Sequence, residues 1–186
     1  MKLFKKLAAA ALAAVLALSM VGCGAGGKGS TSTASELANM LVDTLNQSQQ
    51  IDAKHTGEMD RLAAALATSA GNAENAKETK IKDLLVNSKV LEAAGFTAED
   101  LKNTAYFVSY VENYKPQSPI TTEEQKISWM AQQITQNVQN VGKRTYLGAV
   151  KALELGASTV KIGDTEYIVV VAKSVETAAP STPDKG

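Results

Sequence analysis

His55 is the only histidine of this chain and therefore the first candidate for acid–base chemistry. It lies in the segment Asp52-Ala53-Lys54-His55-Thr56-Gly57, whose composition predicts a turn between two helices. A catalytic base needs a nucleophile beside it and a group that orients it. Asp52 or Asp60 could orient His55, but no nucleophile motif accompanies them. The pattern favours a solvated loop histidine over a catalytic base.

Metal ligands and facing carboxylates are also scarce. One histidine and one cysteine cannot supply the usual zinc ligand sets, and the acidic residues near the histidine lack the spacing of a calcium-binding loop. Glu99-Asp100 and Glu123-Glu124 are adjacent pairs, which do not face each other on a helix as glycosidase carboxylates must. Both pairs are expected at helix starts, where acidic side chains suit the helix dipole. The sequence therefore predicts no metal and no cofactor.

Trp129 is the aromatic residue whose predicted position points to binding. The apolar stripe of its helix runs through Ile127, Met130 and Ile134, and Trp129 faces away from that stripe at 100° per residue. The predicted far face combines an aromatic side chain with amides: Trp129, Gln132, Gln136 and Asn140. Two interpretations stay open. Trp129 either packs beneath another element, because tryptophan is usually well buried, or forms an exposed surface for carbohydrate or protein recognition.

The first residues have the layout of an export signal. Lys2, Lys5 and Lys6 precede an unbroken apolar run over residues 7–18, and positive charge before a short apolar stretch is typical of a secretory signal. A membrane-spanning helix needs about 20 apolar residues, so this run is too short for a permanent span. We therefore expect residues 1–22 to form a signal peptide.

The junction after the apolar run reads Leu18-Ser19-Met20-Val21-Gly22-Cys23. It resembles the lipobox of bacterial lipoproteins, although Met20 stands where that class usually has leucine. The resemblance implies that Cys23 carries diacylglycerol, becomes the first mature residue and anchors the protein to the extracytoplasmic face of the cell membrane. The alternative is an ordinary signal peptide with an incidental cysteine. Cys23 is the only cysteine and so has no disulfide partner within the chain.

Composition divides the remaining chain into three parts. Residues 23–34 are rich in Gly, Ser and Thr, which predicts a flexible tether. Residues 35–176 are long enough for a single globular domain, and residues 177–186 are polar and proline-rich, which predicts a disordered tail. Removing the signal lysines makes the net charge slightly negative and leaves two arginines. This charge balance disfavours nucleic-acid binding.

Apolar residues at helical spacing predict the helices of the domain. The first begins at Thr33, which has capping-box spacing to Glu36. The second ends at Gly71, and the third spans about Lys80 to Ala94 before Gly95. Thr122 is expected to cap a fourth helix within residues 123–155. Its apolar stripe changes face at Gly142, so the helix kinks or breaks there, or its two halves bury different faces.

A hairpin is the clearest β-sheet signal. The segments Val160–Ile162 and Tyr167–Val171 flank Gly163-Asp164, which predicts a hairpin over about 158–173. The unbroken apolar run at 168–171 predicts a strand that is central or buried on both faces.

A third strand over about 104–111 would stabilise this hairpin, and its aromatic and β-branched residues favour one. A helix from Ala98 to Asn113 fits the spacing nearly as well. We therefore expect an α+β fold, with several amphipathic helices packed on one face of a small antiparallel sheet.

These features favour a membrane-anchored, non-catalytic binding or assembly module at the cell surface, with an envelope protein or a glycan as its partner. The alternative is a small envelope enzyme or folding helper that uses carboxylate or tyrosine chemistry. A transporter's binding component ranks third, because such proteins commonly have two lobes and this chain is short for two lobes. That last comparison is an analogy at the level of fold.

Overall fold

A computed structural model describes residues 33–49, 51–113, 119–141 and 150–175. Six helices and five strands occur within these ranges. The helices are α2 (Thr33–Gln49), α3 (Gly57–Gly71), α4 (Ile81–Leu85), α5 (Ser88–Ala93), α6 (Ala98–Asn103) and α7 (Glu123–Gln136). The strands are β1 (Asp52–His55), β2 (Tyr106–Glu112), β3 (Gln139–Asn140), β4 (Ala152–Ile162) and β5 (Thr165–Ser174).

The strands form one mixed sheet in the order β1-β4-β5-β2-β3. β4 and β5 form the C-terminal hairpin, and Gly163 takes the left-handed conformation at its turn, with a φ of 63°. β2 pairs antiparallel with β5 over its whole length. The structure therefore confirms the α+β class, the hairpin and the strand interpretation of residues 104–111. The sheet is mixed rather than purely antiparallel, because β1 pairs in parallel with β4.

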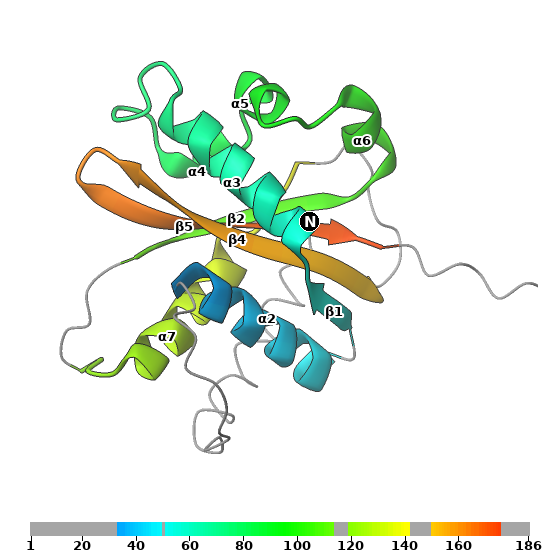
Figure 1. Ribbon diagram of the computed structural model, residues 1–186, viewed down its shortest axis with the longest axis vertical. Helices are drawn as coiled ribbons and strands as arrows, with labels where there is room; N and C mark the ends of the chain where they lie inside the picture. Colours follow the sequence, from blue (N-terminus) through cyan, green and yellow to red (C-terminus); the bar gives the residue numbers. More distant parts are fainter. Residues whose placement is uncertain (1–32, 50, 114–118, 142–149, 176–186) are drawn as a thin grey trace, which may run out of the picture.

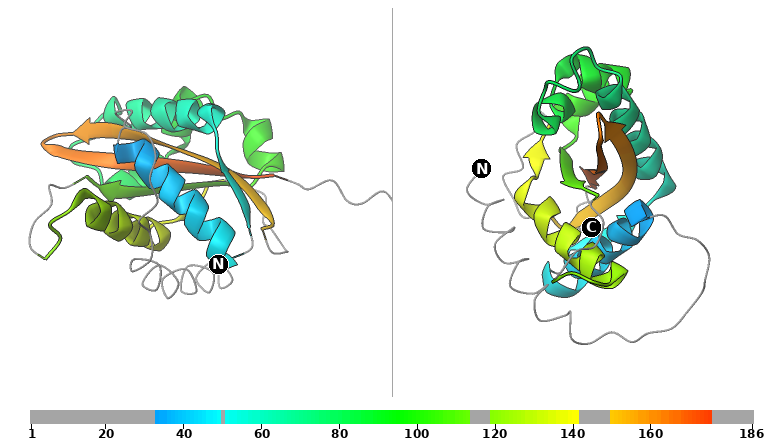
Figure 2. Two further views of the ribbon diagram at one scale, coloured as in Figure 1. Left: turned by 60° about the horizontal axis from the view of Figure 1, so that its bottom comes forward. Right: turned by 90° about the vertical axis from the view of Figure 1, so that its left-hand side faces the viewer.

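Helices cover both faces of the sheet, as Figures 1 and 2 show. α3, α4 and α5 pack on one face, where Val169 and Val171 of β5 join their apolar side chains. α2 and α7 pack on the other face, where Ile168 and Val170 point. The expectation of helices on one face was wrong, whereas the prediction that residues 168–171 are buried on both faces is confirmed.

The predicted third helix is two short helices. α4 ends at Leu85, and α5 begins after Asn87, whose side chain accepts a hydrogen bond from the backbone N–H of Lys89 at 3.0 Å. An Asn side chain that bonds to the nearby backbone favours a helix start over a helix interior. Gly95 follows α5 in the left-handed conformation, with a φ of 92°.

α7 begins as predicted but ends earlier. Thr122 caps it by accepting a hydrogen bond from the backbone N–H of Gln125, and the Gln125 side chain completes the capping box. The helix stops at Gln136, because the chain turns at Asn137 and then forms β3 against β2. The break therefore precedes Gly142, which lies outside the described residues.

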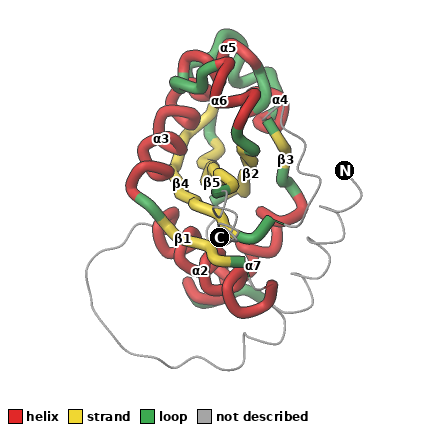
Figure 3. The backbone as a smooth tube through the Cα atoms, turned by 90° about the vertical axis from the view of Figure 1, so that its right-hand side faces the viewer, coloured by secondary structure: helices red, strands yellow, loops and turns green. Residues whose placement is uncertain are grey.

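Two segments that the sequence did not predict as strands are strands in the structure. Residues 52–55 form β1 rather than an interhelical turn, and β4 begins at Ala152 instead of near residue 158. Each supports the other, because Ala53 and Leu153 are partners in the parallel ladder. Figure 3 shows β1 at the sheet edge beside α2.

The described helices include none that is both long and apolar enough to cross a membrane. Cys23, the predicted signal peptide of residues 1–22 and the predicted tail of residues 177–186 lie outside the described residues. The predicted tether, residues 23–34, lies outside them too, except that its last two residues begin α2.

Candidate functional site

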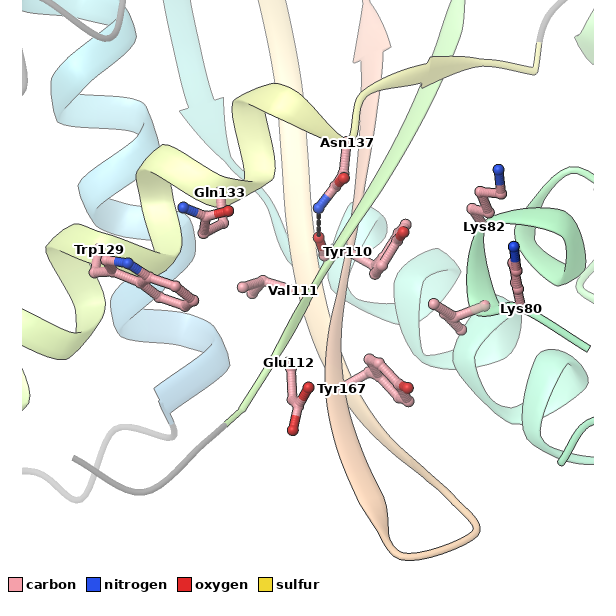
Figure 4. Close-up of a pocket in the computed structure, with 10 residues that line it drawn as sticks. Lys80, Lys82, Tyr110, Val111, Glu112, Trp129, Gln133, Asn137 and Tyr167 are labelled. Carbon is pink, nitrogen blue, oxygen red and sulfur yellow. Dashed lines mark hydrogen bonds between the residues drawn. The ribbon is translucent and has the colours of Figure 1, made fainter. Parts of the chain in front are cut away.

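A groove of about 400 Å³ lies along the outer edge of β2, between α7 and the start of α4. We call it the edge groove. Figure 4 shows the side chains that line it, which come from four regions of the chain and lie on both sides of β2. Its lining residues are Lys80, Ile81, Lys82, Tyr110, Val111, Glu112, Trp129, Gln133, Asn137 and Tyr167.

The α7 wall of the edge groove consists of Trp129, Gln133 and Asn137. These residues are four apart, so they lie along one side of the helix. Two hydrogen bonds fix the end of this wall against β2. Ser109 Oγ donates to the Ile134 carbonyl at 2.6 Å, and Asn137 Nδ2 donates to the Tyr110 carbonyl at 3.1 Å.

Trp129 has two contacts of different kinds. It is half-buried and packs against the apolar cluster beneath α2 and α7, and it also lines the edge groove. The packing interpretation of this residue therefore holds in part, and its role in recognition stays a prediction. A half-buried aromatic side chain is held in place by its packing and still presents surface to a ligand.

The opposite wall carries two tyrosines and two lysines. Tyr110 and Tyr167 pack edge to face, with ring centroids 6.3 Å apart. Burial raises the pKa of the Tyr110 hydroxyl, and the nearby Tyr167 and Asp83 raise it further. Tyr110 is therefore a neutral phenol at physiological pH, which can donate a hydrogen bond but cannot act as a base.

Two lysines lie beside these tyrosines. Lys80 and Lys82 line the α4 side of the groove, and Glu112 is the only carboxylate among its described lining residues. The lysines that form ion pairs in the described ranges are Lys54, Lys126 and Lys173. Neither Lys80 nor Lys82 forms an ion pair with a carboxylate of the described residues.

The structure brings together only part of the predicted binding face. Trp129 lines the edge groove, but Gln132 and Gln136 of the same helix do not. Asn140 was predicted on that helical face and instead lies in β3, paired with Phe107. The amides that accompany Trp129 are Gln133 and Asn137, four and eight residues later, because this side of α7 faces β2.

A polar cluster separate from the edge groove surrounds His55, where α2, β1, α3 and β4 meet. The Nε2 atom of His55 lies 2.8 Å from Asp60 Oδ1, and the Nδ1 atom of His55 lies 2.8 Å from Asn39 Oδ1. The same Asp60 oxygen accepts a hydrogen bond from the Ala157 N–H of β4 at 3.0 Å. The prediction of a solvated loop histidine was wrong, because His55 lies in β1 and both its ring nitrogens have partners. Of the two aspartates that could pair with it, Asp60 does so, whereas Asp52 contacts Lys54.

This cluster is organised to hold the fold together. Both ring nitrogens of His55 have partners, and the carboxylate of Asp60 satisfies a backbone N–H of β4 beyond the last residue that β1 covers. A buried backbone donor without a partner would be costly. The cluster thus ties α2, β1 and α3 to the sheet.

Replacing Asp60 by alanine is expected to lower the free energy of unfolding by about 1–3 kcal/mol, because the Ala157 N–H and the His55 ring lose their acceptor. Urea unfolding measures this loss. Glu58→Ala is the matched control, since Glu58 is also acidic and in the first turn of α3 but pairs with Lys173 at 3.7 Å on the surface. An equal loss in both variants would contradict a specific role for Asp60.

In the part of the chain that the structure describes, no group of three or more His, Cys, Asp or Glu residues is placed to hold a metal ion. No protein-family model, no curated protein and no solved structure matches this chain.

Proposed function

We propose that this protein is a lipid-anchored binding module of the cell envelope that holds its partner in the edge groove. Two features support the proposal. The junction at Cys23 resembles a lipobox, which implies attachment at the extracytoplasmic face of the membrane. The groove then supplies a recessed surface with three aromatic residues, two amides and two lysines.

The side chains of the groove favour binding over catalysis. Hydrolysis of a glycosidic bond needs two facing carboxylates. The described lining residues include a single carboxylate, that of Glu112. The raised pKa of Tyr110 keeps its hydroxyl protonated, so no tyrosinate is at hand to act as a base. The observation that carries the proposal is Trp129, which is half-buried and forms one wall of the groove, since aromatic residues dominate the energy of many interfaces.

Site-specific photo-crosslinking on intact cells tests this proposal. A photo-reactive amino acid at position 133, in the wall of the groove, is expected to give a discrete adduct. The same amino acid at the exposed position 89 of α5 is expected to give none. Replacing Trp129 by alanine in the first protein is expected to weaken the adduct by about tenfold or more, as for a central aromatic contact.

Because Trp129 also packs on the core, Trp129→Phe is the control that keeps most of that packing. The urea midpoint of each variant shows whether the fold survives. Identical adducts from positions 133 and 89, or an adduct that Trp129→Ala leaves unchanged in a folded protein, would refute the edge groove as the binding site.

A further inference from the structure

The outer edge of β2 is only partly covered. β3 pairs with it at Phe107 and Val108, and among the described residues this pairing goes no further. Backbone groups alternate between the two sides of a strand. The Tyr106 carbonyl accepts a hydrogen bond from Val141 on the β3 side, whereas the Asn113 N–H donates to Glu166 on the β5 side. By this alternation, the N–H and the C=O of Glu112 face the edge groove.

The edge already binds an amide at the adjacent outward position. Asn137 Nδ2 donates to the Tyr110 carbonyl at 3.1 Å, from the direction in which a further strand would lie. A peptide backbone could bond in the same way to Glu112, two residues along. Exposed strand edges bind extended segments through such main-chain hydrogen bonds, and side-chain pockets then give specificity.

The charges of the groove select among such segments. Side chains of an extended peptide alternate in direction, so successive residues would face the α7 wall and the α4 wall. The first wall carries Trp129, which suits an apolar side chain, and the second carries Lys80 and Lys82, which suit an acidic one.

We propose that the edge groove binds an extended acidic peptide segment, which adds to the edge of β2 at Glu112 and directs a carboxylate toward Lys80 and Lys82. This inference rests on the proposed function, since it names the partner of the same groove. The outward backbone groups of Glu112 and the two lysines favour a polypeptide over a glycan as the ligand. A glycan is the competing outcome of the test below.

The test is selection from a random dodecapeptide library on phage, with the full-length protein in detergent as the target. Enriched peptides are expected to carry an acidic residue beside alternating apolar ones. Lys80→Glu with Lys82→Glu is expected to lower the affinity for an enriched peptide by about tenfold, because like charges would then face each other. Lys77→Glu with Lys89→Glu changes the net charge equally at exposed positions outside the groove, and should leave the affinity unchanged.

Glu112→Pro tests the backbone contact. The N–H that proline removes faces the groove, so the ladder between β2 and β5 keeps its hydrogen bonds, and proline is tolerated at such edge positions. This variant is expected to lose about tenfold or more in peptide affinity through the missing donor and the blocked edge. N-methylation of alternate residues in the peptide provides the same test without changing the protein.

The outcomes separate this inference from the function on which it rests. No enrichment of acidic extended peptides, or binding that survives both the lysine reversals and N-methylation, would overturn it. Binding of chitin oligosaccharides that depends on Trp129, with no peptide enriched, would overturn it while upholding the binding module. Failure of the membrane-anchored protein to give a Trp129-dependent adduct at position 133 would refute the proposed function itself.

Discussion

Gly156→Ala is expected to destabilise this protein by about 3 kcal/mol or more, at the upper end of what overpacking costs. A Cβ at position 156 would lie 2.2 Å from the backbone nitrogen of Asp60 and 2.3 Å from the carbonyl carbon of Met59. Both atoms belong to the first turn of α3, so no change of side-chain rotamer can relieve the clash. Either β4 or the start of α3 must move.

Urea unfolding, followed by circular dichroism, measures this effect as a lower midpoint with a similar slope. Gly57→Ala is the matched control in the same helix start, because a Cβ there has nothing within 4 Å. Alanine also favours a helix over glycine by about 1 kcal/mol. The control is therefore expected to be neutral or slightly stabilising. A Gly156→Ala protein with an unchanged midpoint would show that this close approach is not needed for folding.

Gly156 also explains why the cluster around His55 forms. Only a residue without a side chain lets the backbone of β4 lie against α3, and that approach places Asp60 within 3.0 Å of the neighbouring Ala157 N–H. Nothing near Gly156 in the sequence indicates this contact, because its partners lie about a hundred residues earlier. The sequence offers Asp60 as a possible partner for His55, but no local signal indicates its hydrogen bond to the Ala157 N–H of the sheet.

The parts of the fold that the sequence predicted correctly have local causes. The hairpin of β4 and β5 follows from Gly163-Asp164 between β-branched runs, and the left-handed Gly163 supports that turn. The start of α7 follows from the cap at Thr122 and its spacing to Gln125. Each of these signals acts over a few residues, so the chain itself contains enough information to place it.

The missed elements depend on distant partners. Ile51 to His55 alternate between buried and exposed, but Asp, Lys and His have low strand propensity, so the composition indicated a turn. Leu153 fits helical spacing equally well. Both segments become strands because they pair with each other and β4 pairs with β5, and such non-local pairing overrides local preference.

The edge groove shows the same division between local and distant information. Trp129 could be selected from the sequence, because one helix determines that it faces away from the apolar stripe. The residues opposite it, Lys80, Tyr110 and Tyr167, come from three other elements and meet it only through the order of the strands. The early end of α7 then moved Asn140 into β3 and made Asn137 a residue of the groove.

Cys23→Ala is expected to abolish membrane attachment, so that nearly all of the protein moves from the membrane pellet to the soluble fraction. The physical reason is the loss of acyl chains, each contributing about 0.8 kcal/mol per buried CH₂ group, of which two or more are needed for a durable anchor. Detergent phase partitioning and mass spectrometry of the mature N-terminus measure the change. Met20→Leu is the control, since it restores the usual residue of the lipobox and should leave attachment intact.

Cys23→Ala also tests whether membrane attachment and peptide binding in the edge groove are independent. Purified Cys23→Ala protein is expected to bind an enriched acidic peptide with unchanged affinity, because the residues of the groove lie between Lys80 and Tyr167. On intact cells it is expected to lose the adduct at position 133, because the released protein no longer lies beside its partner at the membrane. A wild-type protein that fractionates with the soluble proteins, as Cys23→Ala is expected to do, would contradict lipid attachment at this residue and indicate an ordinary signal with an incidental cysteine.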